Sequence, residues 1–150
     1  MDPISALGLA GNIIQFIDFG CKLFSKTKAI YKDGSLTESI DMQVVTDDLR
    51  QYSEKLRQGL QSSGTQQLGF SEDEKALLSM CDGCLQVAGE IDKALQALKL
   101  QSKPGKCKSF RHAIKSVWSD KRLAELKRRL DMYSEQMDRR TLASLRYAHL

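Results

Sequence analysis

Cysteine and histidine are the residue types in this chain best suited to metal, redox or nucleophilic chemistry. Cys81 and Cys84 have the CxxC spacing that zinc sites and dithiol redox centres use. A zinc site needs two further ligands, which Cys107 and His112 could supply. Both cysteines of the pair, however, fall on the apolar seam of a predicted helix, where a small thiol is a core residue. We therefore expect core packing at this motif, with no metal and no cofactor.

The pattern required for catalysis is missing from the sequence. Neither His112 nor His149 has a neighbouring nucleophile and orienting group. The sequence contains no Walker-type glycine loop and no HExxH motif. Gly8 and Gly11 lie within a predicted helix, not after a strand, so they do not form a dinucleotide-binding loop. We expect a protein that is not an enzyme.

Basic residues are concentrated near the C-terminus. Residues 1–98 hold 9 Lys/Arg and 14 Asp/Glu, whereas residues 99–150 hold 14 Lys/Arg and 5 Asp/Glu. A basic segment attracts anionic partners, and each Lys or Arg near an anionic lipid surface contributes about 1 kcal/mol of attraction. A solvated helix face is the alternative interpretation. The candidate anionic-lipid contacts are Lys103, Lys106, Lys108, Arg111, Lys121, Arg122, Lys127, Arg128 and Arg129.

Nucleic acid is a less suitable partner for these cations. The basic segment lacks interleaved aromatic residues and has no turn followed by a recognition-helix pattern. We therefore expect binding to anionic membrane lipid and no binding to nucleic acid.

The N-terminal segment carries no charge from Pro3 to Ile17. Apolar residues fall all round its helical wheel, which predicts a helix that is either buried on every side or inserted into a membrane. A membrane span needs about 20 apolar residues, and the uncharged stretch ends at Asp18. The candidate membrane-inserting residues are Ile4, Leu7, Leu9, Ile13, Ile14, Phe16 and Ile17.

Length and composition fit one globular domain over residues 1–150. Hydrophobic residues make up 41% of the chain and charged residues 28%, which is ordinary for a soluble protein. A chain of this length can bury a core without disulfides. No basic segment precedes the apolar run, so it does not resemble a secretory signal, and we expect a cytoplasmic protein with reduced thiols.

Periodicity predicts long helices over about 3–31, 36–60 and 72–100, and a fourth from about 106 that is long, kinked or capped again near Ser119-Asp120. On the second helix either Val44 or Val45 faces the core. Ser71 and Glu74 suit a capping box before the third. These helices predict an all-α antiparallel four-helix bundle. The third carries a heptad seam formed by Leu77, Cys81, Cys84, Ala88, Ile91, Leu95 and Leu98.

The opening residues, MDPISALGLAGNIIQFIDFG, resemble the start of fungal HeLo-like domains, the N-terminal domains of many fungal NOD-like receptors. Val117-Trp118 and the leucines at 123, 126 and 130 resemble the last helices of that family. The resemblance implies a helical bundle similar to HeLo and to the N-terminal bundle of the mixed-lineage kinase domain-like pseudokinase. It also implies that residues 1–150 are one domain of a longer receptor.

The activity implied by this resemblance is regulated cell death in fungal immunity or heterokaryon incompatibility. The domain would be cytoplasmic at rest and would oligomerise on a signal from a C-terminal nucleotide-binding and repeat region, or from an amyloid-signalling region of its own or a partner chain. The N-terminal helix would then target or permeabilise the plasma membrane. The alternative is a non-lytic protein-interaction or autoinhibitory bundle, whose N-terminal helix is permanently part of the core.

Overall fold

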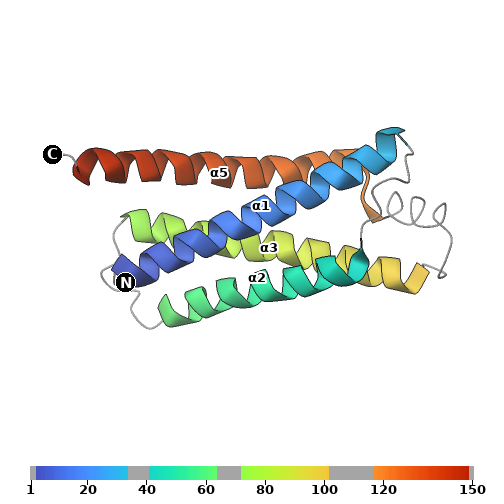
Figure 1. Cartoon of the computed structure of the whole chain (residues 1–150), viewed down its shortest axis with the longest axis horizontal. Helices are drawn as coiled ribbons and strands as arrows, with labels where there is room; N and C mark the ends of the chain where they lie inside the picture. The colour runs from blue at the N-terminus through green and yellow to red at the C-terminus, as the bar shows by residue number, and fades with distance from the viewer. Residues whose placement is uncertain (1–2, 34–40, 64–71, 102–116, 149–150) are drawn as a thin grey trace.

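The computed structural model describes residues 3–33, 41–63, 72–101 and 117–148. These residues form four α-helices, with no strand among them: α1 (Pro3–Asp33), α2 (Met42–Ser63), α3 (Glu72–Gln101) and α5 (Asp120–Ala148) (Figure 1). The predicted all-α four-helix bundle is confirmed. The expected helical segment from about residue 106, and Ser71 of the expected capping box, lie outside the described residues.

The start of α2 differs from the sequence prediction, which placed it near Leu36. Residue 41 precedes the helix, and the Asp41 carboxylate accepts hydrogen bonds from the backbone N–H groups of Gln43 (3.0 Å) and Val44 (3.3 Å). A side-chain acceptor at this position satisfies donors that have no partner within the helix, so α2 begins where Asp41 caps it.

The predicted capping near Ser119-Asp120 is confirmed at the start of α5. The backbone N–H of Arg122 donates to Ser119 Oγ (3.1 Å), and that of Leu123 donates to the Ser119 carbonyl (3.0 Å). Trp118, just before the cap, is buried edge-on against Phe24 of α1, with ring centroids 5.6 Å apart and planes at 79°. This contact fixes the beginning of α5 against the second half of α1.

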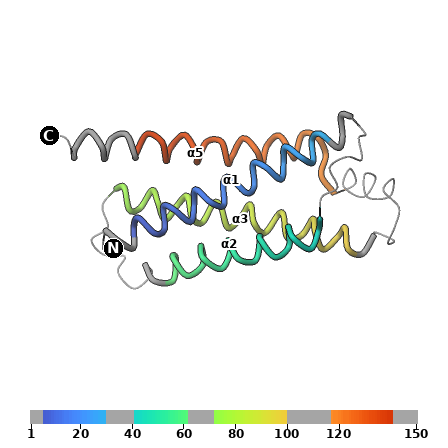
Figure 2. Tube along the Cα trace, in the orientation of Figure 1, coloured from blue at the N-terminus to red at the C-terminus, as the bar shows by residue number. Residues whose placement is uncertain are grey.

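The helices run alternately up and down along the long axis of the molecule (Figure 2). Both α1 and α3 pack against each of the other helices. In contrast, α2 and α5 lie on opposite sides of this central pair (Figure 1). The consecutive helices α2 and α3 form an antiparallel hairpin, and α1 and α5 lie against it.

The core is built around the seam of α3. Every residue of the predicted heptad seam is buried, so that prediction is confirmed. On α2, Val45 packs against the core and Val44 is exposed, which decides between the two alternatives. Glycines allow two close helix contacts, because a Cβ at Gly20 would overlap Leu130 of α5 and one at Gly59 would overlap Leu9 of α1. A larger residue at either position would require the facing leucine side chain to shift.

We expect Leu126→Ala to lower the free energy of unfolding by about 2–5 kcal/mol, because Leu126 is fully buried and its truncation leaves a cavity. Met132→Ala on the same helix is the control: Met132 is 51% exposed, and its truncation should change stability by no more than about 0.5 kcal/mol. Urea denaturation followed by circular dichroism measures both. Equal losses of stability would contradict the assignment of Leu126 to the core.

Candidate functional site: the N-terminal helix and the arginines of α5

One face of α1 is both uncharged and open to solvent over its first half. Leu7 is 76% exposed and Ile14 is 51% exposed, although both are large aliphatic residues. Gly8, Gly11 and Gln15 are exposed between and beside them. We call these five residues the α1 strip. Exposed aliphatic residues gathered on one helix face are typical of a surface that meets another apolar surface.

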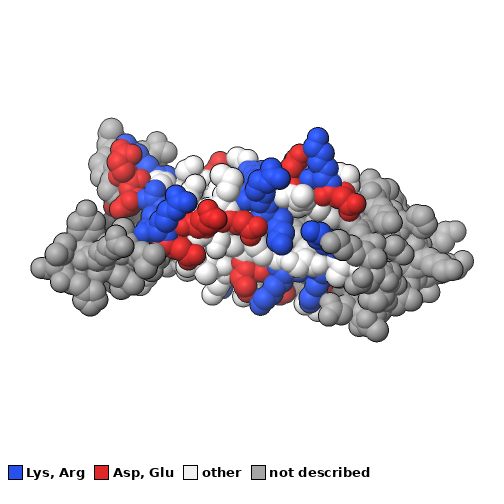
Figure 3. All heavy atoms as spheres, turned by 90° about the horizontal axis from the view of Figure 1, so that it is seen from above, with Lys and Arg blue, Asp and Glu red and all other residues white. Residues whose placement is uncertain are grey.

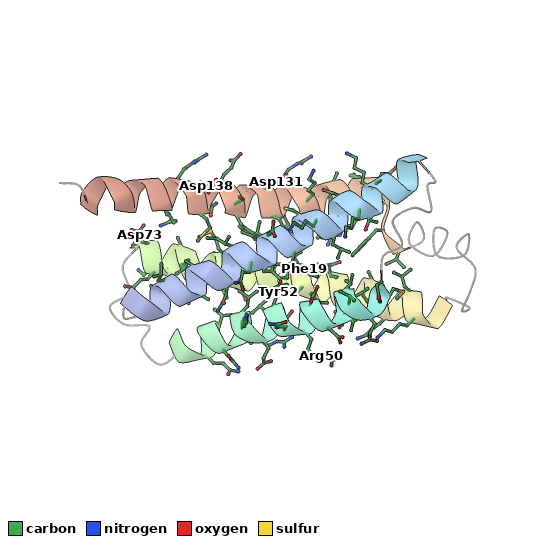
Figure 4. All side chains as sticks on the ribbon, in the orientation of Figure 1. Phe19, Arg50, Tyr52, Asp73, Asp131 and Asp138 are labelled. Carbon is green, nitrogen blue, oxygen red and sulfur yellow. The ribbon has the colours of Figure 1, made fainter. Side chains whose placement is uncertain are left out.

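The opposite side of α1 belongs to the core. Four of the predicted membrane-inserting residues are buried there: Leu9, Ile13, Phe16 and Ile17. Phe19 continues this side toward α2, where its ring lies 5.4 Å from that of Tyr52 (Figure 4). The α1 helix therefore has a packed side and an exposed side, and both sides are uncharged before Asp18.

The expectation that α1 is buried on every side at rest is wrong. Leu7 and Ile14 remain exposed because the three neighbouring helices leave part of α1 uncovered, and Ile14 lies at the edge of a groove that Ser134 and Met137 of α5 also line. Gly8 and Gly11 have open space where a Cβ would stand. Because glycine has no side chain, Gly8 and Gly11 add no apolar side-chain area to this face. This limits the free-energy cost of leaving the face in water. The side chain of Ile4, the remaining candidate, lies outside the described residues.

The apolar part of α1 extends further than the sequence alone indicated. By length and composition, Ala6–Ala29 could cross a membrane, although core helices meet the same criterion. Asp18, expected to end the apolar run, forms an ion pair with Lys22 at 3.0 Å. An ion pair one helical turn apart reduces the cost of bringing either charge toward lipid.

The described basic residues of α5 are divided between inward and outward contacts. Arg122 lies between Glu90 of α3 (3.1 Å) and Glu125 of its own helix (3.2 Å). Hydrogen bonds to these carboxylates raise the pKa of Arg122 above its ordinary value. Arg129 donates to the Gln86 side-chain oxygen of α3 at 3.2 Å. Two of the predicted lipid contacts are therefore occupied by the protein itself.

The other described cations of α5 are more open to solvent: Lys121 and Arg128 are exposed, and Lys127 is partly buried. Lys127 and Arg128 help to line a groove of about 570 Å³ between α1 and α5, which Phe24 and Leu123 also line. Asp120 and Asp131 line the same groove, so its charge is mixed. Blue and red residues are also interspersed on the face shown in Figure 3. Lys103, Lys106, Lys108 and Arg111 lie outside the described residues.

The two cysteines of the CxxC motif face different neighbours. Cys81 is buried, and its thiol donates to the Leu56 carbonyl of α2 at 3.4 Å. Cys84 is also buried, and the positive charge of Arg129 of α5 partly offsets the rise in its pKa. Burial raises the pKa of each thiol to about 12, so neither is a thiolate at neutral pH. The prediction that both are core residues is confirmed.

No group of three or more metal-ligating side chains occurs in the part of the chain that the structure describes. Cys107, His112 and His149 lie outside that part. The chain matches no family model, no curated protein and no solved structure.

A charge placed on α1 should have opposite effects on its two sides. We expect Leu7→Glu to change the free energy of unfolding by no more than about 0.5 kcal/mol, because this side chain is already in water. Ile13→Glu buries an unpaired carboxylate and should destabilise the bundle by about 4 kcal/mol or more. Chemical denaturation of the two variants measures the difference. A large loss of stability for Leu7→Glu would contradict the exposure of the α1 strip.

Proposed function

We propose that this domain is a HeLo-like cell-death effector that acts on the plasma membrane through α1. The observation that carries the proposal is the α1 strip, an uncharged apolar face that remains in water in the folded bundle. The strip offers a first contact with a membrane before any helix has moved. Release of the buried side of α1 would then complete insertion.

The energetics favour this order of events. Leu9, Ile13, Phe16 and Ile17 are buried at rest, so moving them from the core to lipid gains little. Leu7 and Ile14 are exposed, so transfer to lipid gains up to about 1.5–3 kcal/mol for each. Because lipid stabilises the inserted state of α1 more than the folded bundle in water, a membrane shifts the population toward the inserted state. The exposed residues therefore supply the preference for the membrane, and the buried ones exchange one apolar environment for another.

Helix length limits how α1 can enter a bilayer. Residues 3–17 extend about 22 Å at 1.5 Å per residue, which is shorter than the roughly 30 Å of hydrocarbon in a bilayer. Residues 6–29 would extend about 36 Å, which is sufficient to span it. A span over these residues carries Asp18 and Lys22 into the membrane as a pair, and it also includes Lys26 and Lys28 near its C-terminal end. The shorter segment would lie at the interface.

The remaining parts of the proposal follow the resemblance. The domain is cytoplasmic at rest and moves to the plasma membrane when a receptor or amyloid-type signal gathers several copies. Oligomerisation places several α1 strips on one patch of membrane, and their affinities multiply because each later contact is intramolecular. Exposed cations on α5, such as Lys121 and Arg128, add attraction to anionic lipid.

A non-lytic interaction bundle is the second candidate function, and the burial of half of α1 favours it. In that function Ile13 and Phe16 never leave the core, and the α1 strip binds another protein. Slow amide exchange through residues 4–20 in both monomer and oligomer would support this candidate.

We expect the domain, fused to an oligomer-forming tag, to release dye from liposomes containing phosphatidylserine. The double variant Leu7→Glu/Ile14→Glu should abolish release, because it removes the exposed apolar contacts without disturbing the core. Expression in cells, with viability and localisation scored, tests the same pair of variants in vivo.

The matched control is Val44→Glu/Met132→Glu, which adds the same charge at apolar residues with similar exposure to Ile14, 53% and 51%, on α2 and α5. This control should release dye like the unmodified domain. Circular dichroism must give the same helical content for all three proteins. Full release by the α1 variant, or no lipid binding by the tagged domain, would rule out the proposed function.

A further inference from the structure

Three arginines of α5 reach across to α3 at successive positions along the two helices. Arg122 pairs with Glu90 at 3.1 Å, Arg129 donates to Gln86 at 3.2 Å, and Arg140 contacts Asp73. Residue numbers rise along α5 as they fall along α3, as antiparallel packing requires. Figure 4 shows Asp73 at the beginning of α3, on the side toward α5. We call these contacts the arginine series.

The arginine series lies at the surface and is open to competition. The side chains of Arg122 and Arg140 are 39% and 35% exposed, and that of Asp73 is 85% exposed. Exposed ion pairs are individually weak and are weakened further by salt. A guanidinium also binds phosphate and carboxylate oxygens in a bidentate manner, so anionic lipid headgroups offer the same arginines an alternative partner.

The contacts between α5 and α1 are of a different kind. Leu130 packs against Gly20, and Trp118 of the segment before α5 packs against Phe24. Both contacts are apolar and gain nothing from anionic headgroups. Lysines and an arginine also line the groove between α1 and α5, but the ion pairs described between α5 and another helix go to α3. Competition by an anionic surface therefore weakens the α3 side of α5 more than the α1 side.

We propose that an anionic membrane surface opens the interface between α3 and α5 by taking over the guanidinium groups of Arg122, Arg129 and Arg140. This inference rests on the proposed function, because it makes the membrane the agent that starts the release of α1. The open form presents arginines to lipid that the closed form uses internally, so lipid binds it more tightly and shifts the population toward it. After opening, α5 remains packed on α1 and is no longer joined to α3.

The reactivity of the two thiols of the CxxC motif can be used to detect this opening. Gly83 lies against the Tyr133 hydroxyl of α5, since a Cβ there would overlap it, and the neighbouring Cys84 is completely buried. Cys81 instead bonds to Leu56 of α2. Opening between α3 and α5 should expose Cys84 and leave Cys81 protected. Global unfolding would expose both thiols.

The first arm of the test needs no lipid. A thiol-alkylating reagent is added to the reduced protein, and labelling is quantified for each cysteine by peptide mass spectrometry. Arg122→Gln/Arg140→Gln removes the two exposed ion pairs that join α5 to α3, together with the Arg122–Glu125 pair within α5. Loss of the two pairs between the helices should speed labelling of Cys84 by roughly 2- to 25-fold. The control Lys121→Gln/Arg139→Gln removes the same charge from α5, where Arg139 pairs only with Glu135 of its own helix among the ion pairs described. It should label like the unmodified domain.

The second arm compares vesicles of phosphatidylcholine with vesicles that also contain phosphatidylserine. Phosphatidylserine should speed labelling of Cys84 in the unmodified domain and leave Cys81 unlabelled, whereas phosphatidylcholine alone should change neither. Equal labelling of the two cysteines on phosphatidylserine would indicate unfolding and overturn the inference. Identical labelling of the arginine variant and its control would overturn it as well.

The two proposals fail in distinguishable ways. Dye release from phosphatidylserine vesicles with Cys84 still protected would overturn this inference and leave the proposed function standing. Exposure of Cys84 on those vesicles without dye release, even in the tagged oligomer, would support the inference and remove the lytic function.

Discussion

The packing of α1 against its neighbours is the interaction on which the rest of the structure depends. Ile13 and Phe16 are completely buried, and α1 and α3 together separate α2 from α5. The hairpin of α2 and α3 and the arm formed by α5 are joined largely through this one helix. Any event that removes α1 from the core therefore breaks its interfaces with α2, α3 and α5 at once.

An uncharged helical segment with one face in the core and one face in water is a compromise between two environments. The buried face of α1 satisfies the hydrophobic requirement of the core, and its exposed face keeps Leu7 and Ile14 in water. Glycine at positions 8 and 11 limits the area exposed there. The two glycines limit the apolar area in water, and they would also allow lipid or another helix to approach the α1 backbone closely. This shared suitability is the physical basis for the proposed membrane activity.

The sequence predicted the helices best where local periodicity and packing agree. The 4-3 spacing on α3 identified seven of its buried residues, but it did not include Met80, Val87 and Ala94, which are buried as well. It could not separate the two faces of α1 before Asp18, since both are uncharged. A signal was present further along: Asp18, Lys22 and Lys26 continue the α1 strip at helical spacing and mark the outward face. The partners of Arg122 and Arg129 depend on the register between distant helices, which local pattern does not encode.

Trp118 gives the contact between α1 and the start of α5 a further consequence. It is the only tryptophan in the chain, it is buried, and it meets Phe24 edge-on. Intrinsic indole emission therefore arises at a single place, far along α1 from Leu7 and Ile14. Tryptophan emission from the unlabelled protein will describe that end of the bundle alone, so this emission should stay constant while the opposite end rearranges.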